Sequence, residues 1–262
     1  MGQAAARRLA SGRLLVLADY SDKILESTSK SLLEQGHIVK RYALDVSDRA
    51  SVASLAKVAG EAGHIDAIIH TAGVSPAMGI SSKRIHEINL LGTALVIDEF
   101  LPFVSAGTSL VCISSLSGHL AKLSTELEMY LATAPTDQLI HHKEIDLEGE
   151  GYDAAKNAYE LAKRGNQLRV QAKSIAYGKK GARINTISPG VIGTPMGNME
   201  LAGQNRMQVQ GLIDISPAGR IGTPDDVTNA AAFLVGSESS YITGTDILLD
   251  GGSLTAIQWG RS

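Results

Sequence analysis

The chain has 262 residues, which is enough to bury a sizeable core in one α/β domain or in two small ones. Its formal net charge of −3 argues against a nucleic acid or an anionic membrane as partner. No apolar run approaches the roughly 18 residues that cross a bilayer, and the N-terminus has no apolar core typical of a signal peptide. The single Cys112 cannot form an internal disulfide, and its apolar neighbours indicate a buried thiol. We expect a cytoplasmic protein.

Short β-type runs alternate with longer helical patterns along the chain. The predicted strands are Arg13–Ala18, His37–Ala43, Ile65–His70, Ser109–Ser114, Ala182–Ile187 and Asp246–Asp250. The predicted helices are Asp22–Gln35, Val52–Ala62, about Ser82–Phe103, about Asp153–Tyr177 and about Pro224–Leu234, whereas residues 116–150 appear irregular. Strands separated by helices favour right-handed crossovers and a parallel sheet that is covered on both faces. With no repeat and no linker-like composition, residues 1–262 are predicted to form one domain.

Small and acidic residues follow the predicted strands, where open parallel sheets bind their ligands. Asp19 follows the first strand, and its carboxylate could accept both ribose hydroxyls of an adenosine while repelling a 2′-phosphate. The next residue is Tyr20 rather than an arginine that would neutralise such a phosphate. The other strands are followed by Asp45-Val46, by Thr71-Ala72-Gly73, by Ser114-Ser115 and by Ser188-Pro189-Gly190. Together these positions describe a nucleotide groove.

The helix near residues 153–177 contains the pattern Tyr-x-x-x-Lys twice, as Tyr152/Lys156 and Tyr159/Lys163. Residues four and seven positions apart share a helix face, so both pairs could point the same way. A lysine ammonium favours the phenolate of a neighbouring tyrosine, which makes the tyrosine a usable proton donor and acceptor. Helical phase alone does not choose between the two pairs.

Over essentially its whole length the chain resembles the short-chain dehydrogenase/reductase family. The motifs that carry the resemblance are Ala18-Asp19, Leu44-Asp45-Val46, Thr71-Ala72-Gly73, Ile88-Asn89-Leu90-Leu91-Gly92, Ile113-Ser114-Ser115, Tyr-x-x-x-Lys, Arg183-Ile184-Asn185, Ser188-Pro189-Gly190, Gly219-Arg220, Pro224-Asp225-Asp226, Ile242-Thr243-Gly244 and Leu249-Asp250-Gly251-Gly252. The resemblance implies a Rossmann-like, doubly wound parallel sheet in three layers. It also implies an NAD(H)-dependent oxidoreductase of alcohols and ketones, with NADP the less favoured cofactor because of Asp19.

The family spacing chooses between the two Tyr/Lys pairs. In the family, the catalytic tyrosine precedes the proline of the Pro-Gly motif by about thirty residues. Tyr159 lies thirty residues before Pro189, and Tyr152 lies thirty-seven residues before it. The resemblance therefore assigns the catalytic pair to Tyr159 and Lys163.

The resemblance also implies a role for each candidate site residue. Tyr159 would be the general acid/base, Lys163 would lower its pKa and bind the nicotinamide ribose, and Ser115 would hold the substrate oxygen. Asn89 would hold a water that connects Lys163 to bulk solvent. The implied cofactor-binding residues are Asp19, Asp45, Val46, Ala72, Gly73, Tyr159, Lys163, Pro189, Ile192 and Thr194.

The beginning of the chain departs from the family pattern. The family begins with a strand and a glycine-rich turn that holds the pyrophosphate. Here the residues Met1–Leu9 resemble the helix that follows this turn, with Gly2 as its last glycine. We therefore expect a sheet that lacks the first strand. Either Met1 is an internal methionine of a longer natural chain, the reading we favour, or the protein is a shortened, non-catalytic, oligomer-forming paralogue.

Residues 116–150 form the second departure, because most family members have about a dozen residues at this place. The segment carries His141-His142, but no third ligand at a suitable spacing supports a metal site. A similar insertion occurs in the bacterial 3α-hydroxysteroid dehydrogenase/carbonyl reductase subgroup, where it alters the usual dimer packing. A homo-oligomer, either a dimer or a tetramer, is therefore expected.

Residues 193–216 would form a mobile lid over the substrate. The apolar residues Met196, Met199, Leu201, Met207 and Leu212 favour a hydrophobic alcohol or ketone as substrate, although methionines also fill gaps in a core. An epimerase or dehydratase of the extended family fits less well, because the chain is short for that class.

Overall fold

A parallel β-sheet forms the centre of the fold in this computed structural model, which describes residues 1–260. Its strands are β1 Leu14–Asp19, β2 Ile38–Ala43, β3 Ala67–His70, β4 Ser109–Ile113, β5 Arg183–Pro189 and β6 Asp246–Leu249. Every strand pairing in the described residues is parallel. All five residues of β4 are buried, as expected for a central strand that is covered on both faces.

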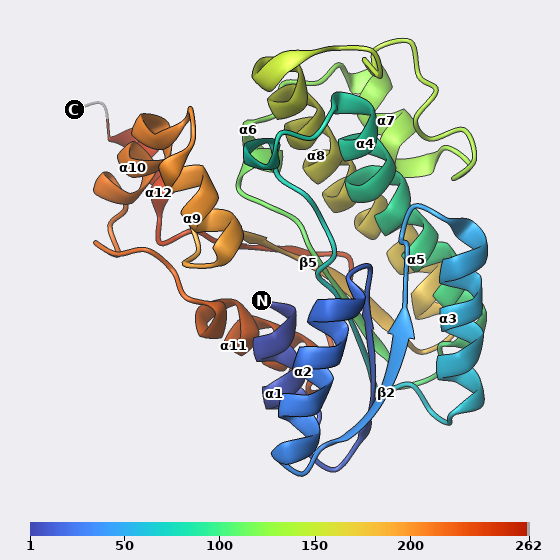
Figure 1. The fold of residues 1–262 in the computed structure, drawn as a ribbon. Helices are drawn as coiled ribbons and strands as arrows, with labels where there is room; N and C mark the ends of the chain where they lie inside the picture. The colour runs from blue at the N-terminus through green and yellow to red at the C-terminus, as the bar shows by residue number, and fades with distance from the viewer. Residues whose placement is uncertain (261–262) are drawn as a thin grey trace.

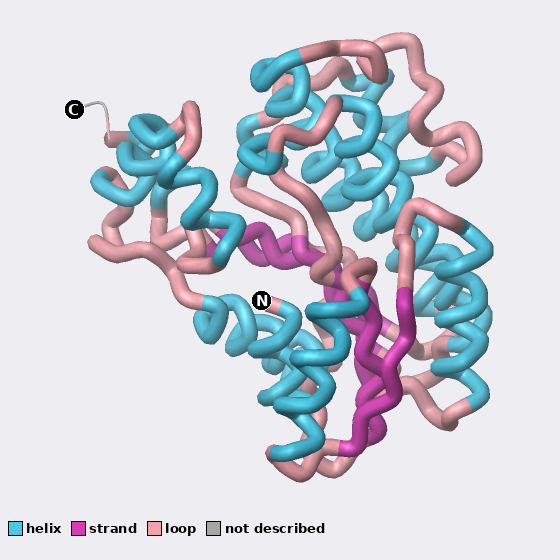
Figure 2. Tube along the Cα trace, in the orientation of Figure 1, coloured by secondary structure: helices cyan, strands magenta, loops and turns pink. Residues whose placement is uncertain are grey.

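Helices cover both faces of this sheet. The helices α1 Gly2–Leu9, α2 Asp22–Glu34 and α11 Pro224–Val235 lie on one face. The helices α3 Arg49–Glu61, α5 Gly92–Phe100 and α8 Gly151–Gly178 lie on the other face (Figure 1). The layers are visible again in the tube of Figure 2, where helices flank the strands. The predicted α/β, doubly wound, three-layer arrangement is confirmed.

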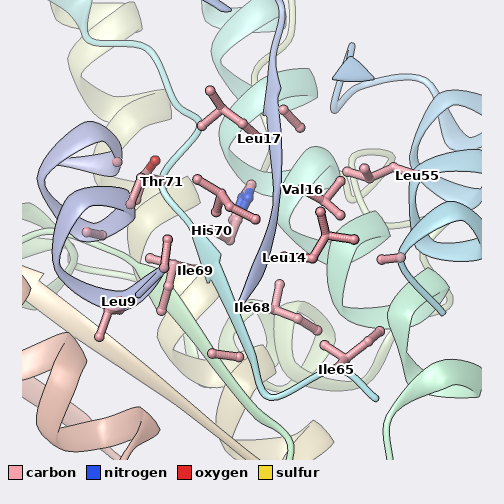
Figure 3. A pocket seen from close by; sticks show the side chains of 18 of the residues that line it. Leu9, Leu14, Val16, Leu17, Leu55, Ile65, Ile68, Ile69, His70 and Thr71 are labelled. Atoms are coloured by element: carbon pink, nitrogen blue, oxygen red, sulfur yellow. The ribbon is translucent and has the colours of Figure 1, made fainter. Parts of the chain in front are cut away.

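The sheet is interrupted between β1 and β3. The strand order is β2-β1 in one part and β3-β4-β5-β6 in the other. Between the facing edges lies a cavity of about 620 Å³, and its lining includes Leu14 and Leu17 of β1 and Ile68 and Ile69 of β3 (Figure 3). Leu14 is 45% exposed although it belongs to an apolar strand. The expected interruption of the sheet is therefore present, at the place where a central strand would pair with both edges.

The largest core cluster packs α3, α5 and α8 against the sheet. On α3 the residues Val52, Leu55 and Ala56 are buried, at the i, i+3 and i+4 spacing of one helix face. They join Leu110 of β4 and Ile184 of β5 in the same cluster. The helix α3 follows β2 in the chain and contacts α5. The packing of its apolar face therefore holds the two-stranded sheet β1-β2 against the rest of the molecule.

The predicted helical pattern from about Ser82 to Phe103 is confirmed in its extent, and its geometry changes along the segment. It consists of α4 Ser82–Ile85, the π-helix η2 His86–Leu91, α5 and the 3-10 helix η3 Leu101–Phe103. Within η2 the carbonyl of Asn89 accepts hydrogen bonds from Thr93 Oγ1 and from Asn166 Nδ2, at 2.8 and 3.0 Å. Such side-chain partners for a backbone carbonyl offer a physical reason for the widened turn at Asn89.

The segment 116–150 is more ordered than predicted. It contains α6 Ser117–Leu120 and α7 Thr125–Thr133, and Ser124 caps α7 by accepting a hydrogen bond from Leu127 N at 3.1 Å. Leu127 and Leu131 of α7 pack with Leu139 in a second core cluster, which also contains residues of α8. The helix α7 is stabilised by burial of its apolar residues against α8, and the local sequence pattern of residues 116–150 was too weak to predict it.

Several shorter elements complete the described chain. They are the helices α9 Pro195–Ala202, α10 Arg206–Asp214 and α12 Ser253–Trp259 and the 3-10 helices η1 Pro76–Met78 and η4 Ser237–Ser239. The elements α9 and α10 form the segment that the sequence predicted as a lid. None of the helices in residues 1–260 combines the length and the apolar character that a bilayer crossing requires.

Candidate active site

A cavity of about 280 Å³ opens at the carboxyl ends of β4 and β5. Tyr152 and Tyr159 of α8 line it together with Ser115, which follows β4. The cavity is also lined by Gly190, which follows β5, and by Glu200 of α9. The cavity therefore lies where ligands bind in open parallel sheets.

Tyr159, Lys163 and Ser115 come together at this cavity. The Lys163 side chain is 6% exposed, and its Nζ donates to the carbonyl of Ile113 at 3.1 Å. Ser114 Oγ in turn donates to the Lys163 carbonyl at 2.8 Å, which fastens α8 to the end of β4. Lys163 Nζ lies 5.4 Å from the centroid of the Tyr159 ring. The lysine is thus fixed behind the tyrosine, and the tyrosine faces the cavity.

The pKa values of this group follow from burial and from one carboxylate. Burial raises the pKa of the Tyr159 phenol well above its usual range, and the charge of Glu200 raises it further. A hydrogen bond with Ser115 acts in the opposite direction. Burial lowers the pKa of Lys163 to about 8, although the charge of Glu200 opposes this. Burial and Glu200 thus favour the protonated phenol, and the predicted effect of Lys163 on the pKa of Tyr159 stays a prediction.

The second pair, Tyr152 and Lys156, lines the same cavity but is arranged differently. Lys156 Nζ lies 3.7 Å from a carboxylate oxygen of Glu160, one turn further along α8. Burial raises the pKa of Tyr152, as do the nearby charges of Glu200, Asp153 and Glu160. Tyr152 therefore has carboxylates around it, and its helical partner Lys156 is engaged elsewhere.

Asn89 lies beside the catalytic candidates, and its side-chain amide is held by the backbone of Val74. Its Oδ1 accepts from Val74 N and its Nδ2 donates to Val74 O, both at 2.9 Å. A Cβ added at Gly73 would lie 3.1 Å from Asn89 Oδ1 and 3.7 Å from Lys163 Nζ. Gly73 therefore leaves space directly in front of both polar groups, as expected of a residue that lets a ligand approach.

Asp19 and Asp45 lie at the carboxyl ends of the first two strands. Asp19 Oδ1 accepts from Ser21 N at 2.8 Å. Asp45 is engaged more completely, because Oδ1 accepts from the Ser47 backbone and hydroxyl and Oδ2 lies 3.3 Å from Arg84 Nη2. Of the two carboxylates, Asp19 has more capacity left for a ribose.

The remaining predicted cofactor residues occupy two places. Ala72 is exposed and Val46 is buried, and both border the gap in the sheet. Pro189, Ile192 and Thr194 line the active-site cavity instead. The hydroxyl of Thr194 caps α9 by accepting from Gly197 N at 3.1 Å.

Comparisons with known proteins show which family the chain belongs to. A family model described as enoyl-(acyl carrier protein) reductase matches residues 1–139 and 147–253. The short-chain dehydrogenase/reductase bsc3 of Alternaria brassicicola is 36% identical over 259 residues, which cover 97% of this chain and 92% of bsc3. The chain belongs to the short-chain dehydrogenase/reductase family.

More distant members of the family are also similar. The 3-alpha-hydroxysteroid dehydrogenase/carbonyl reductase of Comamonas testosteroni is 26% identical over 91% of this chain and 95% of its own. A crystal structure titled as a putative short-chain dehydrogenase/reductase from Burkholderia xenovorans has a TM-score of 0.73 at 26% identity. It covers 97% of this chain and 90% of that one. As a family member, the chain is an oxidoreductase that acts on a small molecule.

Short-chain dehydrogenases typically bind a nicotinamide cofactor, and part of this chain fits one. The space in front of Gly73, the buried Lys163 and the cavity beside Pro189 and Ile192 suit the nicotinamide riboside. Asp19 suits the adenosine ribose. For the pyrophosphate between them, the described residues offer the N-terminus of α1, where a Cβ added at Gly2 would lie 2.7 Å from Thr71 Oγ1.

Two site residues were missed by sequence reasoning. Glu200 of α9 and Ser75 both line the cavity, and Ser75 Oγ donates to Glu200 Oε1 at 2.7 Å. The two residues are 125 positions apart. Glu200 lies within a segment whose methionines indicated an apolar lid, so the local pattern gave no signal for it.

The two histidines of the insertion lie in different surroundings. His142 lies 4.6 Å from Tyr130 between ring centroids, and His141 is exposed. In the part of the chain that the structure describes, no group of three histidine, cysteine or acidic residues could hold a metal ion.

Proposed function

We propose that this short-chain dehydrogenase interconverts a secondary alcohol and a ketone with NAD(H), and that Tyr159 is the general acid/base. The observation that carries the proposal is the placement of the Tyr159 phenol and Ser115 at one cavity, with the Lys163 ammonium fixed behind the phenol. When bound, the nicotinamide supplies or accepts the hydride. The chain itself has to hold the substrate oxygen and move one proton.

The proton step is assigned to three side chains. Ser115 and Tyr159 would each donate a hydrogen bond to the carbonyl oxygen. The phenol of Tyr159 is protonated at neutral pH and would transfer its proton to the developing alkoxide. The buried Lys163 would then stabilise the phenolate until solvent returns the proton.

The preference for NAD over NADP rests on Asp19. Its carboxylate lies at the end of β1 and would accept the ribose hydroxyls, whereas a 2′-phosphate would be repelled. The neighbouring Tyr20 is 76% exposed and carries no positive charge. Comparing NADH with NADPH in wild type and in Asp19→Asn tests this. A preference for NADPH in the wild type would contradict it.

A hydrophobic substrate remains a hypothesis. Met196 and Leu212 of the lid line the cavity, whereas Met199 is 45% and Met207 87% exposed. Turnover of small charged hydroxy acids alone would rule the hypothesis out.

The second candidate function is a non-catalytic, oligomer-forming family member, and the interrupted sheet favours it. Isothermal titration with NADH and NADH consumption against a carbonyl panel distinguish the two functions. The enzyme is supported if the wild type binds NADH and turns over a ketone, and if this turnover is lost in Tyr159→Phe. No binding of NADH by the 262-residue chain, together with a stable dimer or tetramer by light scattering, supports the alternative. In either case we expect a cytoplasmic homo-oligomer, and α7 of the insertion, which packs on α8, would shape its interface.

A further inference from the structure

The lid residue Glu200 contributes a carboxylate to the lining of the active-site cavity. The α9 neighbours of Glu200 include Met199, which is 45% exposed, whereas Glu200 lines the cavity and accepts a hydrogen bond from Ser75 Oγ at 2.7 Å. Ser75 is only 1% exposed, so this contact lies inside the protein. Burying part of a carboxylate costs free energy unless partners compensate for the lost water. The position of Glu200 therefore needs an explanation beyond that of a solvated lid residue.

The contact with Ser75 satisfies Glu200 only in part. The hydrogen bond uses Oε1, and no hydrogen bond to Oε2 is found within residues 1–260. No ion pair in that part of the chain involves Glu200, and the cavity residue Lys156 pairs with Glu160 instead. Glu200 thus keeps a carboxylate oxygen with spare acceptor capacity, and it lines the same cavity as Tyr159 and Ser115.

The charge of Glu200 reaches the reacting groups. It raises the pKa of Tyr159 and of Tyr152, and it opposes the lowering of the Lys163 pKa. Burial also raises the pKa of Glu200 itself, although Ser75 and Lys163 act against this. Glu200 is therefore electrostatically coupled to the catalytic candidates, and the cavity disfavours a further negative charge.

We infer that Glu200 is a specificity-determining residue that accepts a hydrogen bond from a second hydroxyl group of the substrate. The inference rests on the proposed function and deepens it. The substrate class is a neutral hydroxyketone or diol, with its reacting carbon at Tyr159 and Ser115 and its other hydroxyl at Glu200. A carboxylate at the position of that second hydroxyl is rejected by charge repulsion.

A simpler role for Glu200 would be to latch the lid through Ser75. The two roles predict different results for two variants. Glu200→Gln keeps an acceptor for Ser75 and nearly the same shape but removes the charge. Ser75→Ala removes the latch and keeps the carboxylate. A latch affects all substrates alike, whereas a specificity residue changes the ratio between substrates.

The test compares 4-hydroxycyclohexanone, 4-methylcyclohexanone and 4-oxocyclohexanecarboxylate as substrates for NADH oxidation. We expect the wild type to prefer the hydroxyketone and to discriminate against the carboxylate. Glu200→Gln should lower kcat/KM for the hydroxyketone by about 5- to 10-fold, the effect of replacing a hydrogen bond to a charged group with one to a neutral amide. The ratio of kcat/KM for the hydroxyketone to that for the methyl ketone should fall by a similar factor, and the ratio for the carboxylate to the methyl ketone should rise, whereas Ser75→Ala should change all three substrates by a similar factor. Equal effects of Glu200→Gln on all three substrates, or no wild-type preference for the hydroxyketone, would overturn the inference.

Failure of the proposed function would be recognised separately. In that case the wild type oxidises NADH with none of the three ketones. The inference is then decided by calorimetric titration of the 262-residue chain with 1,4-cyclohexanediol. Binding that is lost in Glu200→Gln and kept in Ser75→Ala supports the inference even then. No binding to the wild type, or equal binding to all three proteins, overturns it.

Discussion

Lys163 Nζ lies 5.4 Å from the centroid of the Tyr159 ring and is anchored at 3.1 Å to the carbonyl of Ile113. This relationship links the helix α8 to the central strand β4 and holds the ammonium where it cannot rotate into solvent. The other helical pair lacks it, because Lys156 lies beside Glu160 near the start of α8. The tertiary structure thus makes two similar sequence patterns chemically different.

The two tyrosines are expected to respond differently to loss of the hydroxyl. Tyr159→Phe should reduce kcat by about 10²- to 10⁴-fold, the usual contribution of a general acid/base. Tyr152→Phe should reduce it by less than about tenfold. Steady-state NADH consumption with a ketone substrate measures both, and circular dichroism checks that each variant is folded. The reverse order of the two effects would move the catalytic assignment to Tyr152.

Acid should destabilise the protein through two buried histidines. Burial lowers the pKa of His70 and of His86 to about 4. As the pH falls from 6.5 towards 4, the unfolded chain binds protons at these sites and the folded chain does not. The free energy of unfolding therefore falls, by up to about 3 kcal/mol for each histidine.

His86→Leu should remove about half of this loss, because it removes one of the two sites. The Nδ1 of His86 has no hydrogen-bond partner within the described chain, so a leucine leaves no partner unsatisfied. Urea unfolding between pH 4 and 7 measures the slope of the free energy of unfolding against pH. The control His141→Gln changes an exposed side chain and should leave the slope unchanged. A slope that is the same in wild type and His86→Leu would contradict this explanation.

Two arginines of α8 should differ in their contribution to stability. The side chain of Arg169 is 2% exposed, lies 3.6 Å from Asp98, and donates to Ala134 O at 3.0 Å and to Thr136 Oγ1 at 2.6 Å. Arg169→Met removes the donor to the buried Ala134 carbonyl and one of the two cations beside Asp98, and should lower the free energy of unfolding by about 3 kcal/mol. Arg164 pairs with Glu128 at 2.7 Å, with both side chains about a third exposed, and Arg164→Met should cost below about 1 kcal/mol. Urea unfolding at pH 7 compares them, and similar small losses would mean that the buried network contributes little.

The gap in the sheet should tolerate a larger side chain. Leu17 of β1 faces the cavity between β1 and β3, so Leu17→Phe should change the free energy of unfolding by less than about 0.5 kcal/mol. Ile184 of β5 is fully buried in the main core, and Ile184→Phe should cost about 1 to 3 kcal/mol through overpacking. Thermal and urea unfolding give both values. A large loss for Leu17→Phe would mean that the strand edges come closer together in solution than the cavity indicates.

Much of the fold could be read from local patterns. The alternation of apolar runs and helical periods identified each strand to within a few residues, and Asp19, Gly73, Ser115 and Pro189 were found because they follow those strands. The patterns failed where packing overrides local preference. The π-helix at Asn89 depends on hydrogen bonds from Thr93 and from the distant Asn166. The helix α7 depends on burial of Leu127 and Leu131 against α8.

The sequence by itself determined the class of chemistry, since a tyrosine and a lysine one helical turn apart and a serine after a strand are local features. Only the tertiary structure decided what surrounds them. It fixed Lys163 to the carbonyl of Ile113 in β4 and brought Glu200 to Ser75 across 125 positions. Contacts between residues so far apart depend on how helices pack on the sheet, and no local pattern of residues contains that information.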